Sequence, residues 1–300
     1  MKDLAGRTAF ITGGANGIGY GLAQALLQEG CKVAIADISQ QALADAINNL
    51  NSDNAMAISL DVASREDFAH AADTVEDKLG PVSLVFNNAG VNLFTAIEDS
   101  SFDDWDWLLG VNLHGVINGV MTFSKRMIAR GEPGHIVNTT SMASFIASPI
   151  PGIYNTTKFA VRGLSESLRY SLAEHNIGVS LLCPGLVDSH INCSEEVRPQ
   201  SLSRRGGPVN EEFDEMLANM QRQGMAPAEV ARKTIAAIRQ NRYYIFPHPE
   251  FRDELGEIFD GIINAMPVSE SIPEGRMAIE ASRRERTRAI RNRALQQDWQ

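Results

Sequence analysis

The chain has 300 residues, of which 44% are hydrophobic and 21% charged, which is the composition of a globular protein with a substantial core. A core of this size needs neither a metal nor a disulfide to complete it. The formal net charge of -10 disfavours nucleic acid and anionic membrane surfaces as main partners, although local dipoles could still hold a small anionic cofactor.

The cysteines and the N-terminal segment bear on the cellular compartment of the protein. Cys31, Cys183 and Cys193 form no close pair, so we expect free thiols in a reducing compartment. The first residues lack the apolar core of a secretion signal, and no run of 18 apolar residues follows. We therefore expect a cytoplasmic protein with no membrane partner. None of the six histidines shows metal-ligand spacing, and no metal site is predicted.

Short apolar segments recur along the chain, with helix-patterned segments between them. The apolar segments show little polar alternation, which is typical of parallel strands buried on both faces. The intervening segments carry apolar residues three and four apart. This alternation predicts an α/β fold: a single Rossmann-type, doubly wound parallel sheet with helices on both faces. The predicted strands are Thr8–Thr12, Lys32–Ala36, Ala55–Leu60, Leu84–Phe86, His135–Thr139, Val179–Cys183 and Tyr243–Phe246.

The regular alternation stops after Pro184. Residues 186–225 are polar, contain several Gly and Pro, and include one helical stretch near Glu211–Met220, so we expect a lid or binding loop. An Ala-rich helix beginning near Pro227 precedes the last strand. No linker separates two domains. We predict one domain over residues 1–250, including the lid, with residues 251–300 as its helical C-terminal extension.

A glycine-rich turn, TGGANGIG at residues 12–19, joins the first strand to the first helix. Glycines suit a turn that needs unusual φ/ψ angles and close approach to a pyrophosphate. The free N–H groups at the helix start add an anion site. The spacing departs from G-x-G-x-x-G, but an acidic residue, Asp37, ends the second strand as dinucleotide binding requires. Residues 1–250 are therefore predicted to be a dinucleotide-binding catalytic domain.

Asp37 bears on which dinucleotide is bound. Its carboxylate is placed to accept hydrogen bonds from an adenosine ribose, and its charge would repel a 2′-phosphate. No Arg or Lys lies in the turn or just after Asp37 to bind such a phosphate. The predicted cofactor is therefore NAD rather than NADP. An alternative is that Asp37 caps the next helix.

Tyr154 and Lys158 lie four residues apart at the start of a predicted helix and so share one face. An unperturbed tyrosine, with a pKa of about 10, is a poor base at neutral pH. A nearby ammonium and an oxidised nicotinamide would both lower that pKa and make a usable general acid/base. Taken alone, Y-x-x-x-K is also the pattern of an ordinary surface pair.

The motifs together resemble the short-chain dehydrogenase/reductase family. The resemblance covers about residues 5–190, in the family's order and spacing, and is weaker to about residue 250. The matching elements are TGGANGIG at 12–19, Asp61-Val62, Asn87-Asn88-Ala89-Gly90, Asn112, Ser141, Tyr154 with Lys158, Pro184-Gly185 and Ser189.

This resemblance implies a catalytic set of four residues. Tyr154 would exchange the hydroxyl proton, and Ser141 would orient and polarise the substrate oxygen. Lys158 would lower the pKa of Tyr154 and bind the nicotinamide ribose, while Asn112 would support a water that links Lys158 to solvent. The alternatives are that Ser141 is an ordinary strand-end cap and that Asn112 ties helix backbone groups together.

The resemblance also implies which residues bind the cofactor. Those in the glycine turn would hold the diphosphate, and those after the third and fourth strands would contact the adenine and the rest of the cofactor. Residues at the start of the lid would flank the nicotinamide carboxamide. The full set is Gly13, Asn16, Gly17, Ile18, Gly19, Asp37, Asp61, Val62, Asn88, Ala89, Gly90, Tyr154, Lys158, Pro184, Gly185, Val187 and Ser189.

Apolar residues surround the expected reaction centre and indicate the substrate class. A mostly apolar site suits a bulky hydrophobic or aromatic alcohol better than a sugar or a hydroxy acid. The alternative is that several of these residues belong to the core. The candidates are Val91, Leu93, Phe94, Met142, Phe145, Ile146, Ile150 and Ile153.

The C-terminal extension combines an apolar stripe, from Phe251 to Ile263, with an Arg-rich segment over residues 283–293. It is similar to the tails of family members that oxidise benzylic alcohols of lignin-derived aryl ethers. The stripe indicates packing on this subunit or on a neighbour, and we expect a homo-oligomer, either a dimer or a tetramer. The Arg-rich helix is expected to be solvated rather than to bind nucleic acid.

The predicted function is reversible hydride transfer between NAD(H) and a hydrophobic secondary alcohol or ketone, aromatic ones included. The alternative from another class is a non-catalytic, NAD-sensing regulatory or scaffold protein, which would need the glycine turn and Asp37 but not the catalytic set. Epimerisation or dehydration on the same fold is a third possibility that the complete set of four residues disfavours.

Overall fold

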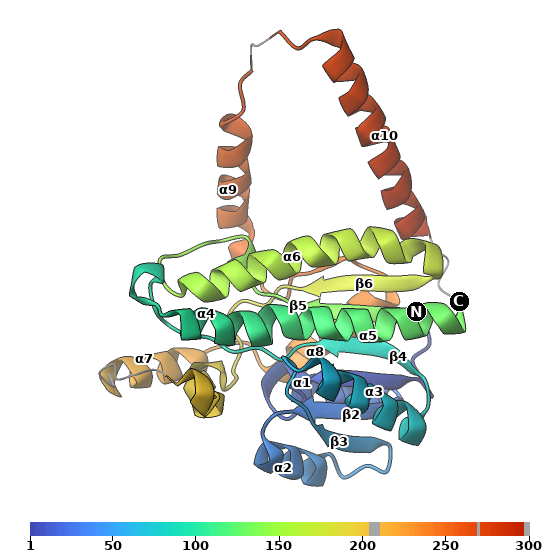
Figure 1. The fold of residues 1–300 in the computed structure, drawn as a ribbon, viewed down its shortest axis with the longest axis vertical. Coiled ribbons are helices and arrows are strands. Elements are labelled where there is room, and N and C mark those ends of the chain that lie inside the picture. Colours follow the sequence, from blue (N-terminus) through green and yellow to red (C-terminus); the bar gives the residue numbers. More distant parts are fainter. Residues whose placement is uncertain (204–210, 269–270, 297–300) are drawn as a thin grey trace.

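A computed structural model describes residues 1–203, 211–268 and 271–296 of the chain. Within these ranges seven strands form one sheet, in the order β3-β2-β1-β4-β5-β6-β7, and every neighbouring pair is parallel (Figure 1). The predicted Rossmann-type α/β fold is confirmed. The strands are β1 (Thr8–Thr12), β2 (Lys32–Asp37), β3 (Ala55–Ser59), β4 (Val82–Asn87), β5 (Gly134–Thr139), β6 (Ile177–Leu182) and β7 (Tyr244–Ile245).

Each predicted strand is present, with ends that differ by at most two residues. The inner strands β1, β4, β5 and β6 are buried along their whole length, which explains their apolar composition. β3 differs, because it lies at the edge of the sheet and its residues are exposed or half-buried. β7, at the opposite edge, keeps only two of its four predicted residues, since only Tyr244 and Ile245 pair with β6.

Helices cover both faces of the sheet, and each face has its own apolar cluster. On one face α1, α2 and α8 pack over a cluster that includes Leu22, Ile35 and Ile238. On the other face α3, α5 and α6 enclose Phe10, Phe68 and Phe123, whose ring centroids lie 4.9–6.2 Å apart. The helices are α1 (Gly17–Gln28), α2 (Gln40–Leu50), α3 (Arg65–Leu79), α4 (Phe102–Leu109), α5 (Gly115–Arg130), α6 (Gly152–Leu172), α7 (Glu211–Gln221) and α8 (Pro227–Arg239).

The strand order reverses next to β1, which lies between β2 and β4. In such sheets the connections after neighbouring strands leave toward opposite faces, and a crevice opens at the carboxyl ends of the strands. The glycine turn follows β1, Asp37 ends β2, Asn88 follows β4, Ser141 follows β5 and Pro184 follows β6. The fold therefore brings segments from across the sequence to one edge of the sheet.

The predicted lid leaves the body after β6 and returns to it before α8. Its base is closed by a parallel bridge between Val187 and Met225, in which Met225 N–H donates to Leu186 (2.9 Å) and Asp188 N–H donates to Met225 (3.0 Å). Between these points lie two short 3-10 helices, Ile191–Val197 and Gln200–Leu202, and α7. Residues 204–210 of the predicted lid lie outside the described residues.

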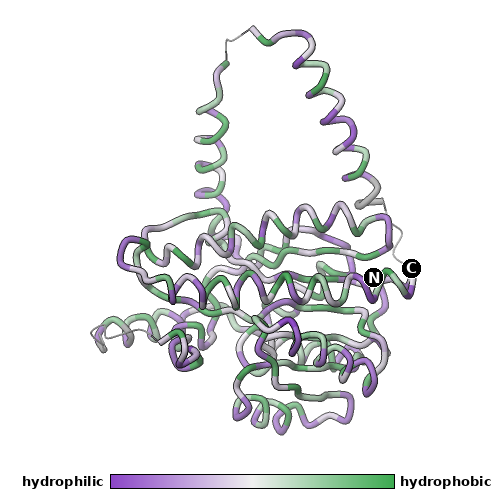
Figure 2. Tube along the Cα trace, in the orientation of Figure 1, coloured by the Kyte–Doolittle hydropathy of each residue, from purple (hydrophilic) through white to green (hydrophobic). Residues whose placement is uncertain are grey.

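The C-terminal extension is helical, as predicted, and forms α9 (Arg252–Asn264) and α10 (Glu274–Gln296). Both helices project from the body, and α10 returns toward the far end of α6 (Figure 1). The apolar stripe packs along its first half: Phe251, just before α9, and Leu255 contact the core, and the Arg162 guanidinium lies 5.9 Å from the Phe259 ring centroid. Ile262 and Ile263, at the end of the stripe, are more than half exposed. Hydrophilic residues dominate the end of α10 (Figure 2), and its described arginines lie at the surface, as predicted. The division into residues 1–250 and 251–300 stays a prediction.

In the described ranges no helix is both long enough and apolar enough to cross a membrane. The three cysteines, all of them described, form no disulfide, as predicted. Burial raises the pKa of the Cys31 thiol to about 12, which leaves it unreactive near neutral pH.

We predict that His135 makes folding sensitive to acid. The ring is fully buried in β5, and burial, reinforced by the positive N-terminus and Arg169, lowers its pKa from 6.5 to about 3. The imidazole in the unfolded chain therefore becomes protonated below about pH 6.5, whereas the imidazole in the folded chain stays neutral down to about pH 3. The folded state is most stable above pH 6.5, and its free energy of unfolding decreases as the pH falls from 6.5 toward 3. The loss is on the order of a few kcal/mol.

The measurement is urea unfolding of the wild type and His135→Gln at pH 7 and pH 4. The amide of Gln keeps a donor toward Ser180, whose hydroxyl lies 2.8 Å from Nε2, but cannot take up a proton. We expect His135→Gln to lose less stability between the two pH values, while His175→Gln, at an exposed site, behaves like the wild type. Equal acid sensitivity of all three proteins would contradict the prediction.

Candidate active site

Tyr154, Lys158 and Ser141 converge where β5 and α6 meet. Tyr154 and Lys158 lie in the first two turns of α6, and Ser141 caps the short 3-10 helix after β5 by accepting from Ala143 N–H (3.1 Å). Tyr154 and Lys158 are only 9% and 3% exposed. The Ser141 hydroxyl donates to the Pro184 carbonyl (3.4 Å) and lies close enough to the Tyr154 hydroxyl to lower its pKa. Ser141 therefore acts both as a strand-end cap and as a contact of Tyr154, and the Tyr154–Lys158 pair is not a surface pair.

Burial controls the charge of this site in the chain alone. It raises the pKa of Tyr154 to about 12, against the lowering effect of Ser141, and it lowers the pKa of Lys158 to about 8. The Lys158 ammonium lies 5.3 Å from the centroid of the Tyr154 ring. In the chain without cofactor, desolvation of the phenolate thus outweighs the lowering effect of Ser141.

Lys158 and Asn112 face the same glycine. A Cβ atom on Gly90 would lie 3.3 Å from Asn112 Oδ1 and 3.4 Å from Lys158 Nζ, so the absence of a side chain keeps this space open. Lys158 donates to the Thr139 carbonyl (3.2 Å). Asn112 accepts from Val91 N–H (2.8 Å) and donates to the Val91 carbonyl (2.9 Å), holding the segment after β4 in place.

Asn112 also joins two helices. Its amide donates to Thr157 Oγ1 in α6 (3.2 Å), and Asn112 itself lies in a π-helical turn, Gly110–His114, between α4 and α5. Such turns often occur at functional sites. The side chain therefore ties the segment after β4 to α6 rather than tying helix backbone groups together, and its support of a water next to Lys158 stays a prediction.

The glycine turn forms a tight cradle at the start of α1. Gly13 and Gly17 have φ angles of +60° and +50°, which side chains rarely adopt. A Cβ atom on Gly13 would lie 2.8 Å from Ala89 Cα, and one on Gly17 would lie 3.0 Å from Ser189 Cβ. Asn16 is the N-cap position of α1, and Ile18 packs against the core below. The turn thus brings together the segments after β1, β4 and β6, with the helix N–H groups facing them.

Asp37 lies at the end of β2 beside this turn. Its carboxylate accepts from Ser39 N–H (3.1 Å) and from Ala15 N–H (3.4 Å), and burial raises its pKa despite these bonds. The N-cap of α2 is Ser39, whose hydroxyl accepts from Ala42 N–H (3.3 Å). Capping of α2 is therefore not the role of Asp37.

Asn88 links three strand ends. Its amide donates to the carbonyls of Thr12 (3.2 Å) and Gly13 (3.3 Å), and it accepts from the Thr139 hydroxyl (3.3 Å). Thr12, which sequence reasoning did not single out as a site residue, accepts in turn from the backbone N–H groups of Asn88 (2.9 Å) and Ala89 (3.1 Å).

Asp61 and Val62 follow β3 and form the outer end of the crevice. Val62 is buried, and its carbonyl accepts from the Asn118 amide (2.8 Å). Asp61 accepts from Ala63 N–H (2.9 Å). Both lie beside the carboxyl end of β2, next to Asp37, because β2 pairs with β3.

The segment of residues 184–189 crosses the crevice from β6 to the lid. The Pro184 carbonyl accepts from Met142 N–H (2.8 Å), next to Ser141. From α7, Gln221 donates to the Val187 carbonyl and to the Ser189 hydroxyl (3.1 Å). His248, after β7, contacts the same segment at Gly185 and Leu186. Sequence reasoning missed Gln221 and His248, since neither lies in a motif and only the fold brings them to this segment.

Fewer apolar residues surround Tyr154 than the sequence predicted. Val91, Leu93 and Ile153 form one buried cluster with Tyr154 and Trp107. Phe94 makes an edge-on contact with Phe213 of α7, at a centroid distance of 6.2 Å.

The other residues predicted to contact the substrate do not belong to the cluster around Tyr154. Met142 and Phe145 belong to the core cluster under α6, where Phe145 packs on Phe246 and on the Arg162 guanidinium. Ile146 is half-buried against the same cluster, and Ile150 is 47% exposed. The alternative that several of these residues are core residues is therefore correct for Met142 and Phe145. The sequence could not exclude Met142 and Phe145 as substrate contacts, because the path of the loop after β5 decides on which side of the sheet their side chains lie.

A buried ion pair fastens the lid to α4. Arg198 donates to Asp104 (2.6 Å), and their side chains are 4% and 0% exposed. Burial tends to raise the pKa of Asp104, but hydrogen bonds from Ser101 and Arg198 outweigh it and hold that pKa below its usual value. The Arg198 guanidinium also lies 4.8 Å from the Trp107 ring centroid. The described part of the lid is thus anchored beside the apolar cluster that contains Tyr154.

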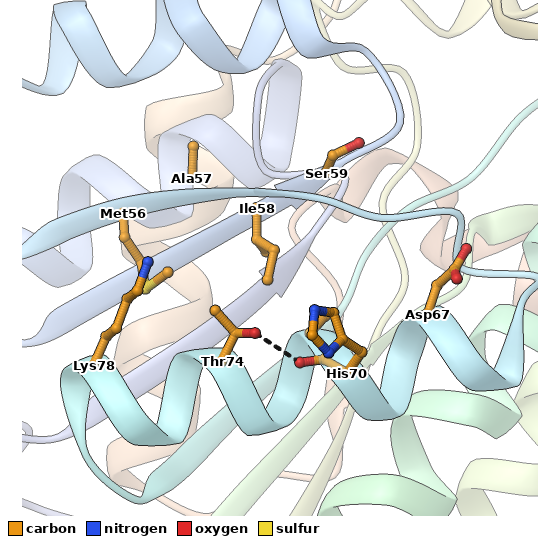
Figure 3. A pocket seen from close by; sticks show the side chains of 9 residues that line it. Met56, Ala57, Ile58, Ser59, Asp67, His70, Thr74 and Lys78 are labelled. Atoms are coloured by element: carbon orange, nitrogen blue, oxygen red, sulfur yellow. Dashed lines mark hydrogen bonds between the residues drawn. The ribbon is translucent and has the colours of Figure 1, made fainter.

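A hollow of about 360 Å³ lies away from this crevice, between β3 and α3, where Met56, Ile58, His70 and Lys78 line it (Figure 3). None of the predicted site residues borders it. Across the described ranges, no group of three or more His, Cys, Asp or Glu could hold a metal ion.

Comparison with known proteins agrees with this geometry. The model of the short chain dehydrogenase family matches residues 7–199, and the chain belongs to this family of oxidoreductases. A C alpha-dehydrogenase of Sphingobium sp. strain SYK-6 is 41% identical over 297 residues, covering 97% of both chains.

Solved structures give the same family. A short-chain dehydrogenase structure from Novosphingobium aromaticivorans has a TM-score of 0.85 and 48% identity, covering 98% of this chain and 100% of that one. A short chain dehydrogenase/reductase from Burkholderia phymatum, in complex with NAD, has a TM-score of 0.85 and 33% identity and covers 91% and 100%.

We predict that Arg198→Met loosens the lid. The substitution leaves the fully buried Asp104 carboxylate without its cation, and breaking a buried pair in this way costs about 3 kcal/mol. Limited proteolysis should then cut within residues 186–203 faster than in the wild type. Glu195→Gln is the matched control, because Glu195 contacts the same guanidinium but is 51% exposed. The double variant Arg198→Met/Asp104→Asn has no unpaired buried carboxylate, and it should recover part of the resistance to proteolysis. Wild-type cleavage of Arg198→Met would contradict the assignment.

Proposed function

We propose that the protein is an NAD(H)-dependent dehydrogenase that interconverts a hydrophobic, aromatic secondary alcohol and its ketone. The observation that carries the proposal is the burial of Tyr154 beside Lys158, with the Ser141 hydroxyl close to the Tyr154 hydroxyl, at the carboxyl edge of a family-typical parallel sheet. The apolar cluster around Tyr154 supports a hydrophobic substrate, and the C alpha-dehydrogenase relative supports an aromatic one, in line with the tail's similarity to aryl-ether alcohol dehydrogenases.

The crevice has the features that a dinucleotide requires. Gly13, Gly17 and Gly90 let neighbouring segments approach more closely than a Cβ atom would allow, and the N-terminus of α1 offers N–H groups to a diphosphate. Asp37 lies where an adenosine ribose would bind, and Lys158 lies between Gly90 and Tyr154, where a nicotinamide ribose would bind. When bound, oxidised NAD supplies a hydride acceptor and a positive charge.

The chain's own residues would handle the proton. Ser141 holds the substrate oxygen against Tyr154, and Tyr154 takes the hydroxyl proton in oxidation or returns it in reduction. The raised pKa of Tyr154 in the chain alone means that the phenolate needs added positive charge before it can form at neutral pH. Lys158, whose pKa is about 8, still carries its charge at pH 7 and provides part of it.

The non-catalytic alternative is less well supported by the structure. A protein that only senses NAD would need the glycine turn and Asp37 but would gain nothing from burying a lysine and a tyrosine together. Burying ionisable groups is costly, and the shifted pKa values of Tyr154 and Lys158 measure that cost. Such groups cluster at catalytic sites. Cytoplasmic location and a homo-oligomeric state remain part of the proposal.

We predict that Tyr154→Phe abolishes turnover but spares cofactor binding. Loss of the acid/base hydroxyl should lower kcat by at least about 100-fold, whereas the Kd for NAD should change little. The measurement is NADH absorbance with a panel of secondary alcohols, aryl and aliphatic, together with NADH fluorescence titration. Tyr170→Phe, on the same helix, is the matched control. Turnover retained by Tyr154→Phe would refute the role of the tyrosine, and a preference for aliphatic alcohols would refute the substrate class.

We predict that Asp37→Ala weakens the preference for NAD. Removing the carboxylate deletes both the acceptor for the ribose hydroxyls and the charge that repels a 2′-phosphate. The ratio of kcat/KM with NAD to kcat/KM with NADP should fall by about tenfold or more. Asp45→Ala, at an exposed position of α2, should leave the ratio unchanged. An unaltered ratio in Asp37→Ala would show that another residue selects the cofactor.

A further inference from the structure

His248 is a buried histidine that belongs to none of the family's motifs. It lies in the turn after β7, beyond residue 199 where the match to the family model ends, and it is 5% exposed. Its ring contacts two consecutive residues of the 184–189 segment. Gly185 N–H donates to Nδ1 (3.0 Å), and Nε2 lies 2.9 Å from the Leu186 carbonyl.

These two contacts fix the state of the ring. A backbone N–H can only donate, so Nδ1 must be unprotonated, and a carbonyl can only accept, so Nε2 must carry the hydrogen. The ring is therefore neutral and in the Nε2–H form. Each ring nitrogen is matched to one backbone group, so a side chain with only one polar atom could not make both contacts.

The turn that carries His248 is itself held rigidly. Lys233 of α8 donates to the Pro247 carbonyl (2.7 Å) and pairs with Glu229 (2.8 Å). Phe251 also packs against Gly185: a Cβ atom there would lie 2.4 Å from the Phe251 ring and 3.2 Å from His248 Cγ. The two rings thus occupy the space that a side chain at position 185 would need.

The other supports of the 184–189 segment come from Met142, whose N–H donates to the Pro184 carbonyl (2.8 Å), and from the lid. Met225 bonds to Leu186 and Asp188, and Gln221 bonds to Val187 and Ser189. The Leu186 carbonyl accepts from both Met225 N–H and His248. His248 therefore holds the segment to the body of the protein independently of the lid, and any lid movement would be transmitted to the part of the segment beyond Leu186.

We propose that His248 is a positioning residue for the cofactor: its neutral ring fixes the backbone of Gly185 and Leu186, and so the surface on which the nicotinamide end of NAD lies against Ser141 and Tyr154. It does not touch the reacting atoms. The inference rests on the proposed function, since it assumes that NAD binds in this crevice. It predicts that His248 controls the orientation of the nicotinamide more than the affinity for the adenosine half, which lies at the other end near Asp37.

The test uses three substitutions in the full-length protein. The amide oxygen of Asn takes about the place of Nδ1, and the amide nitrogen of Gln takes about the place of Nε2. His248→Asn therefore keeps the acceptor for Gly185, His248→Gln keeps the donor for Leu186, and His248→Leu keeps neither. His70→Leu, at an exposed position of α3, is the matched control.

The first measurement is hydrogen exchange of peptides covering residues 184–190 in the protein without cofactor. We expect exchange to be about tenfold faster or more in His248→Leu, with partial protection in His248→Asn and His248→Gln, and no change in His70→Leu. This readout requires no activity. The exchange result is therefore valid even if the proposed dehydrogenase function is wrong. That failure would be recognised separately, because the wild-type protein would bind NAD but show no turnover.

The second measurement separates positioning from folding. We expect kcat with an aryl secondary alcohol to fall about tenfold or more in His248→Leu, the Kd for NAD to change by less than about threefold, and kcat to recover partly in His248→Asn or His248→Gln. Unchanged exchange and kcat in His248→Leu would overturn the proposal. An equal loss of kcat, NAD affinity and thermal stability in all three variants would overturn it as well, since that is the pattern of a merely structural residue.

Discussion

The structure depends on the burial of a phenol and an amine side by side at the carboxyl edge of a parallel sheet. Burial moves the pKa of Tyr154 up and that of Lys158 down, so each group is pushed toward its neutral form. A site of this kind responds strongly to added charge, because little water is present to screen it. The rest of the crevice keeps these two groups in fixed positions until a charged cofactor and a substrate oxygen arrive.

Short polar side chains at the strand ends provide that fixed frame. Thr12, Asn88 and Asn112 each bond to backbone groups of another segment, so the ends of β1, β4 and β5 and the start of α6 form one hydrogen-bonded unit. Their carbonyl and N–H partners would otherwise be buried without satisfaction, at a cost comparable to a lost hydrogen bond. The frame explains why the motifs at these positions contain Thr and Asn, since these residues can bond to backbone without filling the crevice.

The side of the site that faces the substrate is built differently. The 184–189 segment is held by the lid through Gln221 and Met225 and by the body through His248, while Arg198 and Asp104 fasten the lid to α4. The contact of His248 with Gly185 and the ion pair between Arg198 and Asp104 each join residues that are far apart in the sequence. The catalytic frame and the lid therefore have separate attachments to the body of the protein.

The sequence by itself determined which motif follows which strand and the Rossmann-type class, because buried parallel strands and glycine turns leave local patterns that need no knowledge of distant contacts. Only the tertiary structure decided that Ser39 rather than Asp37 caps α2, that Phe145 packs in the core, that the end of the α9 stripe is exposed, and that Gln221 and His248 contact the 184–189 segment. These facts depend on which surfaces the path of the chain brings together. A single side chain carries no local record of a partner 30 or 60 residues away.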